Sequence, residues 1–281
     1  MTEYGRQSRF RDTAGLDAVQ ARELADRLEL RAKSPAEVEA RQAYLDLLGV
    51  QAGECVLDVG CGSGAVTRDI ARRVGPAGRV VGIDPSPQFL VVARELAEEA
   101  GLGSALEFCE GSALQLPFPQ ASFDVAVAVT VLAHTPAGEG AVAEMARVVR
   151  PGGRVGVFDL DTDMTTVAHP DRALTRRIVA AASDASAVDG WLSRRLPSLF
   201  ARAGLEDVRV RGFFPLETDP LGFYASMLER ASEIALTAGA ITEGERRGWL
   251  EALHAEQARG PVIAGRLHIF TWGRKPAKRS S

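Results

Sequence analysis

One stretch of sequence decides the fold: VLDVGCGSG, running from Val56 to Gly64. Its first half is apolar, as in a buried strand, and its second half places glycines at alternate positions, Gly60, Gly62 and Gly64. A helical pattern follows over residues 65–74. Strand, glycine turn and helix in this order bring a helix N-terminus to a bound ligand, and glycine lets the backbone approach that ligand closely.

A second apolar strand, expected at residues 79–83, ends in Asp84, about 20 residues beyond the glycines. A carboxylate at this place can accept hydrogen bonds from both hydroxyls of a ribose, which implies a nucleoside cofactor at two adjacent strand ends. The glycine spacing is G-x-G-x-G rather than G-x-G-x-x-G, and Asp58 lies inside the strand just before it. This spacing suits a ligand without a pyrophosphate and disfavours a nicotinamide dehydrogenase.

Four blocks in order carry a resemblance to a known family. They are VLDVGCGSG, GIDPSPQFLVVAREL, EGSALQLPFPQASFDVAVAVTVLAHTP and RVVRPGGRVGVFD, which together extend over residues 56–159. In these blocks the chain resembles the class I S-adenosylmethionine (SAM)-dependent methyltransferases, and most of all their small-molecule branch with the ubiquinone/menaquinone methyltransferases. The resemblance implies SAM as the cofactor and S-adenosylhomocysteine as its product.

The pattern of apolar segments predicts an α/β fold, a doubly wound and mostly parallel sheet with helices on both faces. We expect strands at 54–59, 79–83, 105–109, 123–129, 153–159, 208–211 and 267–272, and core helices at 65–74, 87–100, 139–149 and 192–203. The resemblance implies a seven-stranded, Rossmann-like sheet whose last strand is antiparallel. Pro151-Gly152-Gly153 is expected to form a tight turn before the fifth strand.

Three regions are expected along the chain. Residues 1–50 form a helical lid, with helices over 16–33 and 36–48; residues 51–160 form the SAM-binding core; residues 161–281 complete the α/β core. Two insertions, near 160–191 and 213–264, have no place in a minimal core. Insertions of this length are usually functional, so we expect them to cap the substrate together with the lid.

The resemblance assigns the cofactor contacts to specific positions. These are Asp58, Gly60, Gly62 and Gly64 around the methionyl and ribose parts, Asp84 on the ribose, Phe89, Ser112 and Ala113 at the adenine, and Val129 and Thr130 near the methyl group. Ser112 stands where the family often has aspartate, which weakens the expected contact with the adenine amino group. Ordinary structural roles stay open: a non-binding glycine turn, a turn cap at Asp58, and core packing at Phe89.

A general base is harder to assign. His134, just after the fourth strand, is the first catalytic candidate, because an imidazole can take a proton from an acceptor hydroxyl or carbon. The resemblance favours the other role, in which His134 shapes the pocket through backbone hydrogen bonds. His169, in the first insertion, is the second candidate, whereas His268 alternates within a strand and is expected to be structural. Arg31 and Arg195 could anchor a carboxylate, although surface exposure fits both.

The function expected is methyl transfer from SAM to a small apolar or aromatic acceptor, such as a quinone precursor or secondary metabolite. A SAM-binding protein that transfers no methyl group is the alternative. Nucleic-acid methylation is less favoured, since the net charge is −4 and no central segment is conspicuously basic. We expect no metal site, no membrane span, and a cytoplasmic protein with three reduced cysteines. Nothing in the sequence indicates the oligomeric state.

Overall fold

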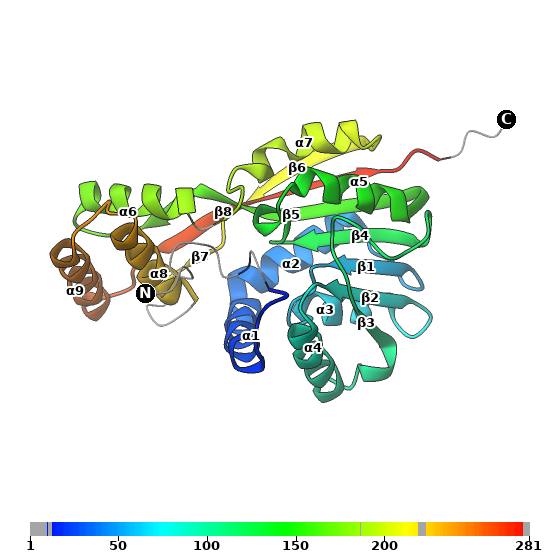
Figure 1. The fold of residues 1–281 in the computed structure, drawn as a ribbon, viewed down its shortest axis with the longest axis horizontal. Helices are drawn as coiled ribbons and strands as arrows, with labels where there is room; N and C mark the ends of the chain where they lie inside the picture. Colours follow the sequence, from blue (N-terminus) through cyan, green and yellow to red (C-terminus); the bar gives the residue numbers. More distant parts are fainter. Residues whose placement is uncertain (1–9, 11–12, 186, 219–222, 278–281) are drawn as a thin grey trace.

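The computed structural model describes residue 10 and residues 13–185, 187–218 and 223–277 of the chain. One mixed sheet organises these residues, with strand order β3-β2-β1-β4-β5-β8-β6 and the short β7 paired to β8 (Figure 1). The strands are β1 (Cys55–Val59), β2 (Arg79–Asp84), β3 (Leu106–Glu110), β4 (Phe123–Val129), β5 (Val149–Val167), β6 (Glu206–Phe213), β7 (Leu216–Glu217) and β8 (Ala264–Arg274).

Helices connect and cover these strands. They are α1 (Ala18–Lys33), α2 (Pro35–Leu48), α3 (Ala65–Val74), α4 (Pro87–Glu99), α5 (Gly138–Val148), α6 (Arg172–Ala185), α7 (Leu192–Arg202), α8 (Phe223–Thr237) and α9 (Glu243–Arg259), with two 3₁₀ turns, η2 (Gly103–Ala105) and η3 (Leu132–His134). Local sequence explains several ends: Asp17 caps α1 in a reciprocal capping box with Gln20, and Gly49 ends α2 in the left-handed region.

The parallel part of the sheet confirms the predicted fold. Strands β1 to β5 pair in parallel, whereas β8 runs antiparallel between β5 and β6. Asp58 is paired with Gly82 and Val59 with Ile83, so β1 and β2 end at the same edge. This register brings the glycine turn beside Asp84.

Both faces of the sheet are buried, because side chains alternate along each strand. Leu57 and Val59 of β1 belong to a core shared with Met145 of α5 and Leu196 of α7. Val56, just before Leu57, points to the opposite face, in a core that includes residues of α2 and α3. The sheet therefore lies between two helical layers, as the alternating pattern predicts.

Strands β5 and β8 extend beyond the rest of the sheet, as Figure 1 shows at its left. The sequence predicted that the fifth strand ends at 159 and that the last strand begins at 267, so both predicted strands are too short. Their extensions pair from Thr165↔Arg266 to Val167↔Ala264 and connect to α6, α8 and α9, which share a separate apolar core around Trp249. The two insertions thus form one helical lobe.

The tight turn predicted before the fifth strand lies elsewhere. The segment Pro151-Gly152-Gly153 does not precede the strand but lies within β5, where pairing with β4 jumps from Phe123↔Val149 to Val125↔Arg154. Gly152 has φ 81° in this bulge. The chain does turn at these residues, but β5 pairs with β4 both before and after the turn, so the turn is a bulge within the strand.

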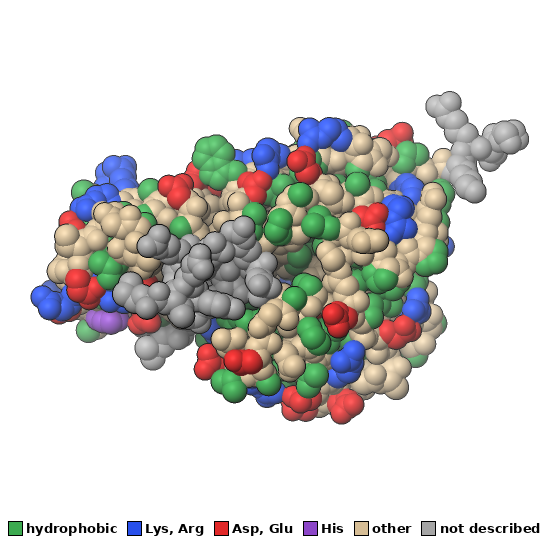
Figure 2. Space-filling view, in the orientation of Figure 1, with side chains coloured by type: hydrophobic (Ala, Val, Ile, Leu, Met, Phe, Trp, Pro, Cys, Tyr) green, Lys and Arg blue, Asp and Glu red, His purple; other side chains and the backbone are tan. Residues whose placement is uncertain are grey.

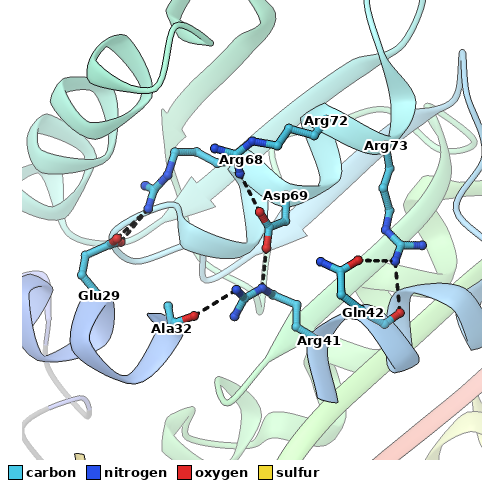
Figure 3. A network of polar contacts seen from close by, with 8 residues as sticks. All are labelled: Glu29, Ala32, Arg41, Gln42, Arg68, Asp69, Arg72 and Arg73. Carbon is cyan, nitrogen blue, oxygen red and sulfur yellow. Dashed lines mark hydrogen bonds and ion pairs between the residues drawn. The ribbon is translucent and has the colours of Figure 1, made fainter. Parts of the chain in front are cut away.

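Polar contacts fasten the N-terminal helices to the sheet's first crossover helix (Figure 3). Glu29 of α1 accepts two hydrogen bonds from Arg68 of α3, at 2.8 and 2.7 Å. Arg41 of α2 donates to Asp69 at 2.5 Å and to the carbonyl of Ala32 at 3.0 Å. Residues preceding β1 are thereby held over the edge where the glycine turn lies.

Candidate active site

The glycine turn is built by positive φ angles and bonds to the neighbouring strand. Gly60 has φ 72° and Gly62 has φ 51°, in the region where side chains are disfavoured. The amides of Gly60 and Cys61 both donate to the carbonyl of Ile83, at 2.7 and 3.0 Å. A Cβ at Gly60 would lie 2.5 Å from a methyl of Val131, so no side chain fits there.

This turn opens into a cavity of about 470 Å³ between the sheet edge, α1, α2 and α8. Nine of the ten predicted cofactor positions line it: Asp58, Gly60, Gly62, Asp84, Phe89, Ser112, Ala113, Val129 and Thr130. Gly64 does not: it is the N-cap residue of α3, and a Cβ there would meet Ala93 and Phe108. The cavity brings together residues from four separate strand ends, as parallel sheets do.

Asp84 holds the turn and still faces the cavity. One carboxylate oxygen accepts from the Gly62 amide at 3.0 Å and the other from the Ser86 amide at 2.9 Å. Burial raises the pKa of Asp84 to about 6, although these amides oppose the shift. Each oxygen has a second lone pair, so the group can accept further hydrogen bonds from a ligand.

Asp58 is more deeply buried than Asp84, with 1% of its surface exposed. It accepts a hydrogen bond of 2.6 Å from the Thr67 hydroxyl of α3. Burial raises the pKa of Asp58 to about 7, and the charge of Asp84 adds to this effect. The side chain therefore holds α3 and also presents a carboxyl group whose charge a nearby cation would stabilise.

The end of β4 carries a strained residue beside a buried ion pair. Thr130 has φ 55°, unusual for a β-branched residue, and its hydroxyl accepts from Arg31 at 3.1 Å. Arg31 also pairs with Glu37 at 3.1 Å. Burial opposes both charges, but each ion stabilises the other, so the pKa of Glu37 is lowered and that of Arg31 raised. Arg31 was expected only as a possible anchor; it lines the cavity.

Phe89 and Ser112 lie on the side of the cavity nearest β2 and β3. Phe89 is buried and packs in one cluster with Ala21, Leu24 and Ala25 of α1, while its ring also lines the cavity. Packing and ligand contact are thus compatible for this ring. The Ser112 hydroxyl accepts from the Leu114 amide at 3.2 Å, which leaves one acceptor position and its proton for other partners.

The two histidine candidates lie in different places. His134 lines the cavity, 5.5 Å between ring centroids from Phe10, and burial lowers its pKa to about 4. His169 stacks on Trp249 in the helical lobe, outside the cavity. Its Nε2 bonds the Trp249 carbonyl at 3.0 Å and its Nδ1 accepts from the Asp171 amide at 3.0 Å. The second catalytic candidate therefore does not line this cavity.

Sequence reading missed one wall of the cavity. Arg266 and His268 of β8, together with Tyr224 and Met227 of α8, line it from the side opposite β2. His268, expected to be structural, is buried with a pKa lowered by burial to about 3. A charged residue at an alternate position of an otherwise apolar strand, as in Arg266-x-His268, is the signal that could have indicated this wall. Arg195, by contrast, is exposed and pairs with Asp189.

Comparisons with known proteins agree with this geometry. A family model described as a methyltransferase domain matches residues 56–153. An uncharacterized 37.1 kDa protein of transposon TN4556 from Streptomyces fradiae is 32% identical over 84% of this chain and 67% of its own. The ubiquinone/menaquinone biosynthesis C-methyltransferase of Hahella chejuensis is 40% identical over 41% of this chain, which covers 46% of that relative.

Solved structures show the same fold. The crystal structure of a putative methyltransferase from Bacillus halodurans superposes with a TM-score of 0.59, covering 85% of this chain and all of that one, at 19% identity. The residues matched by the family model include the glycine turn and strands β1 to β4. The chain belongs to the class I SAM-dependent methyltransferases.

Proposed function

We propose that this protein binds SAM in the cavity and transfers its methyl group to a small, apolar or aromatic acceptor. One observation carries the proposal: the bare backbone at Gly60 and the Asp84 carboxylate share a cavity with an apolar wall from α1 and α8. The first two suit a nucleoside, and the wall suits a small organic molecule. The named methyltransferase relative matches less than half of its own length, so the acceptor is inferred from this wall.

The residues present fit the cofactor chemically. Asp84 has acceptor capacity beyond its two backbone bonds, as a ribose diol requires. Asp58 is a buried carboxyl group that accepts a hydrogen bond from the Thr67 hydroxyl, and it suits the cofactor's ammonium. Phe89 and Ala113 offer apolar surface for the adenine ring of the cofactor. Bound SAM supplies a methyl carbon that is already electrophilic, and the protein supplies position and dryness.

The N-terminal helices are assigned the role of a lid. Leu24 and Leu28 of α1 line the cavity, and Glu29 bonds both Arg68 and the Ser63 hydroxyl of the glycine turn, the latter at 2.7 Å. Met227 and Ile234 of α8 close the same space from the helical lobe. Together these side chains exclude water from the site. In this proposal, residues 1–50 act as the lid and residues 51–160 bind the cofactor. Residues 161–281 complete the α/β core and supply the insertions that cap the substrate.

His134 is assigned to the acceptor. With its pKa lowered to about 4, its imidazole is neutral near pH 7 and able to accept a hydrogen bond or proton, although it is a weak base. This favours orientation of an acceptor hydroxyl over full proton abstraction. An acceptor that is already ionised, or that reacts through an activated carbon, would need little from His134 beyond this orientation.

The environment of the protein is also inferred. Three free cysteines in the described chain suit a reducing cytoplasm. Within those residues, no helix combines the length and the apolar character that crossing a bilayer requires. On the face drawn in Figure 2, Lys and Arg side chains are interspersed with Asp and Glu, which favours a small acceptor over nucleic acid.

Formation of S-adenosylhomocysteine tests the proposal. The purified protein is incubated with SAM and a panel of phenols, hydroxyquinols and apolar amines, and the product nucleoside is quantified. We expect turnover with at least one aromatic acceptor and none with Asp84→Asn, whereas Asp26→Asn, an exposed change on α1, leaves turnover unchanged. Tight SAM binding without product from any acceptor would favour the non-transferring alternative.

A further inference from the structure

The acceptor wall of the cavity carries a cation without an acidic partner. Arg266 is half-buried and lines the cavity, and its Nε donates to the Thr165 hydroxyl at 2.9 Å. Among the described residues no carboxylate lies within ion-pair distance of it. A guanidinium stays charged near neutral pH, so within the described chain this charge has no carboxylate paired with it.

Two neighbouring acids are engaged elsewhere. Asp161 holds Arg194 through two bonds, at 2.6 and 2.8 Å. Glu37 is paired with Arg31. Glu217, on β7 opposite Ala264, does not line the cavity, and its two buried carboxylate oxygens have no hydrogen-bond partner among the described residues. Of the groups that line this side of the cavity, Arg31 and Arg266 are therefore matched by one carboxylate, that of Glu37.

His268 is the second observation that points to a ligand. It lies two residues after Arg266, on the same face of β8, and stacks on Phe158 with 4.9 Å between ring centroids. Only 4% of its surface is exposed, and within the described chain its Nδ1 has no hydrogen-bond partner. Burial keeps the ring neutral, so it can donate or accept one hydrogen bond.

Position separates this pair from the proposed cofactor contacts. Strand β8 lies three strands from β1 in the sheet order, about 14 Å at the usual strand spacing. Arg31, which bonds Thr130 at the end of β4, is closer to the glycine turn and is the better partner for a cofactor carboxylate. Arg266 lines the same cavity as apolar side chains of α8 such as Met227, on the side assigned here to the acceptor.

We propose that the acceptor is an amphipathic acid, an apolar or aromatic body with a carboxylate or an ionised phenol or enol that Arg266 binds and His268 orients. The inference rests on the proposed methyltransferase function, because it names the substrate class of the same cavity. Arg266 is then a specificity residue, which selects the charge of the acceptor but does not bind the cofactor.

Two matched probes test this without turnover: 1-anilinonaphthalene-8-sulfonate and N-phenyl-1-naphthylamine, which share a skeleton and differ by one anionic group. Fluorescence titrations are performed on the protein saturated with S-adenosylhomocysteine. We expect the wild type to bind the anion at least tenfold more tightly than the neutral probe, about 1.4 kcal/mol. Arg266→Gln removes the preference without weakening the neutral probe, Arg266→Lys retains most of it, and the surface control Arg195→Gln behaves as wild type.

Calorimetry with S-adenosylhomocysteine separates the two proposals. Affinity for this nucleoside that is unchanged in Arg266→Gln supports assignment of the residue to the acceptor, and a large loss overturns it. Equal affinity of the wild type for both probes, binding of neither, or a preference that survives Arg266→Gln would overturn the inference. No heat with the nucleoside in the wild type would instead refute the proposed function.

Discussion

Replacing Glu29 by glutamine tests how the lid is attached. The carboxylate accepts two hydrogen bonds from Arg68 and one from the Ser63 hydroxyl, and the ion-pair side chains are only 13% and 10% exposed. Glutamine keeps the shape but loses the charge, so Arg68 keeps its bond to the Ser63 carbonyl and loses its ionic partner.

The magnitude follows from this geometry. A hydrogen bond to a charged group contributes about 1.5–3 kcal/mol, and losing one member of a fully buried pair costs roughly 3–5 kcal/mol. Because Arg68 retains a backbone partner and some exposure, we expect a loss of about 2 kcal/mol. For a chain of this size that lowers the melting temperature by roughly 4 °C.

Thermal melting and a double-mutant cycle measure the effect. Glu23→Gln, an exposed change on the same helix, should leave the melting temperature unchanged. Glu29→Gln, Arg68→Gln and the double variant should show a coupling energy of about 2 kcal/mol. Glu29→Gln should also bind S-adenosylhomocysteine more weakly, because α1 lines the cavity. A coupling energy near zero, with affinity intact, would refute the argument that this bridge holds the lid.

Two other outcomes concern the glycine turn. Gly60 and Gly49 have nearly the same φ, 72° and 70°, but only at Gly60 would an added Cβ meet a close neighbour, Val131. In thermal melts, Gly60→Ala should therefore destabilise the protein by about 2 kcal/mol more than Gly49→Ala. Equal losses of stability in the two variants would count against this steric argument. Asp58, with a pKa raised by burial to about 7, keeps its proton in the folded state when the unfolded chain has lost it. Its contribution to stability should therefore decline from about pH 4 to 7, and Asp58→Asn should flatten this slope in denaturant titrations at several pH values. A slope unchanged by the substitution would contradict the assignment.

Local sequence was sufficient for the parallel core. The glycine turn, Asp84 and the capped helices each depend on a few adjacent residues, so their positions could be predicted to within one or two residues. The end of β5 could not, because residues 160–167 become a strand only by pairing with β8, about a hundred positions later. Helix α6 likewise packs on α8 and α9 to form a core that no local window contains.

The candidate site likewise has a part that local sequence predicts and a part that depends on distant strand pairing. Positions beside the turn were predictable from motif spacing, since the register of β1 and β2 follows from their apolar patterns. That His268 also lines the cavity could not be predicted, because a histidine in a strand is equally consistent with a packed ring. Only the antiparallel insertion of β8 shows that Arg266 and His268 face the cavity. His169 lies outside the cavity, because its ring stacks on Trp249 in another core.

The most direct test of the central claim is a calorimetric titration of the folded, ligand-free protein with S-adenosylhomocysteine. We predict one saturable site in the wild type and a loss of at least tenfold in affinity in Asp84→Ala, whose circular dichroism should match the wild type. Absence of heat in the wild type, or undiminished affinity in Asp84→Ala, would contradict the account.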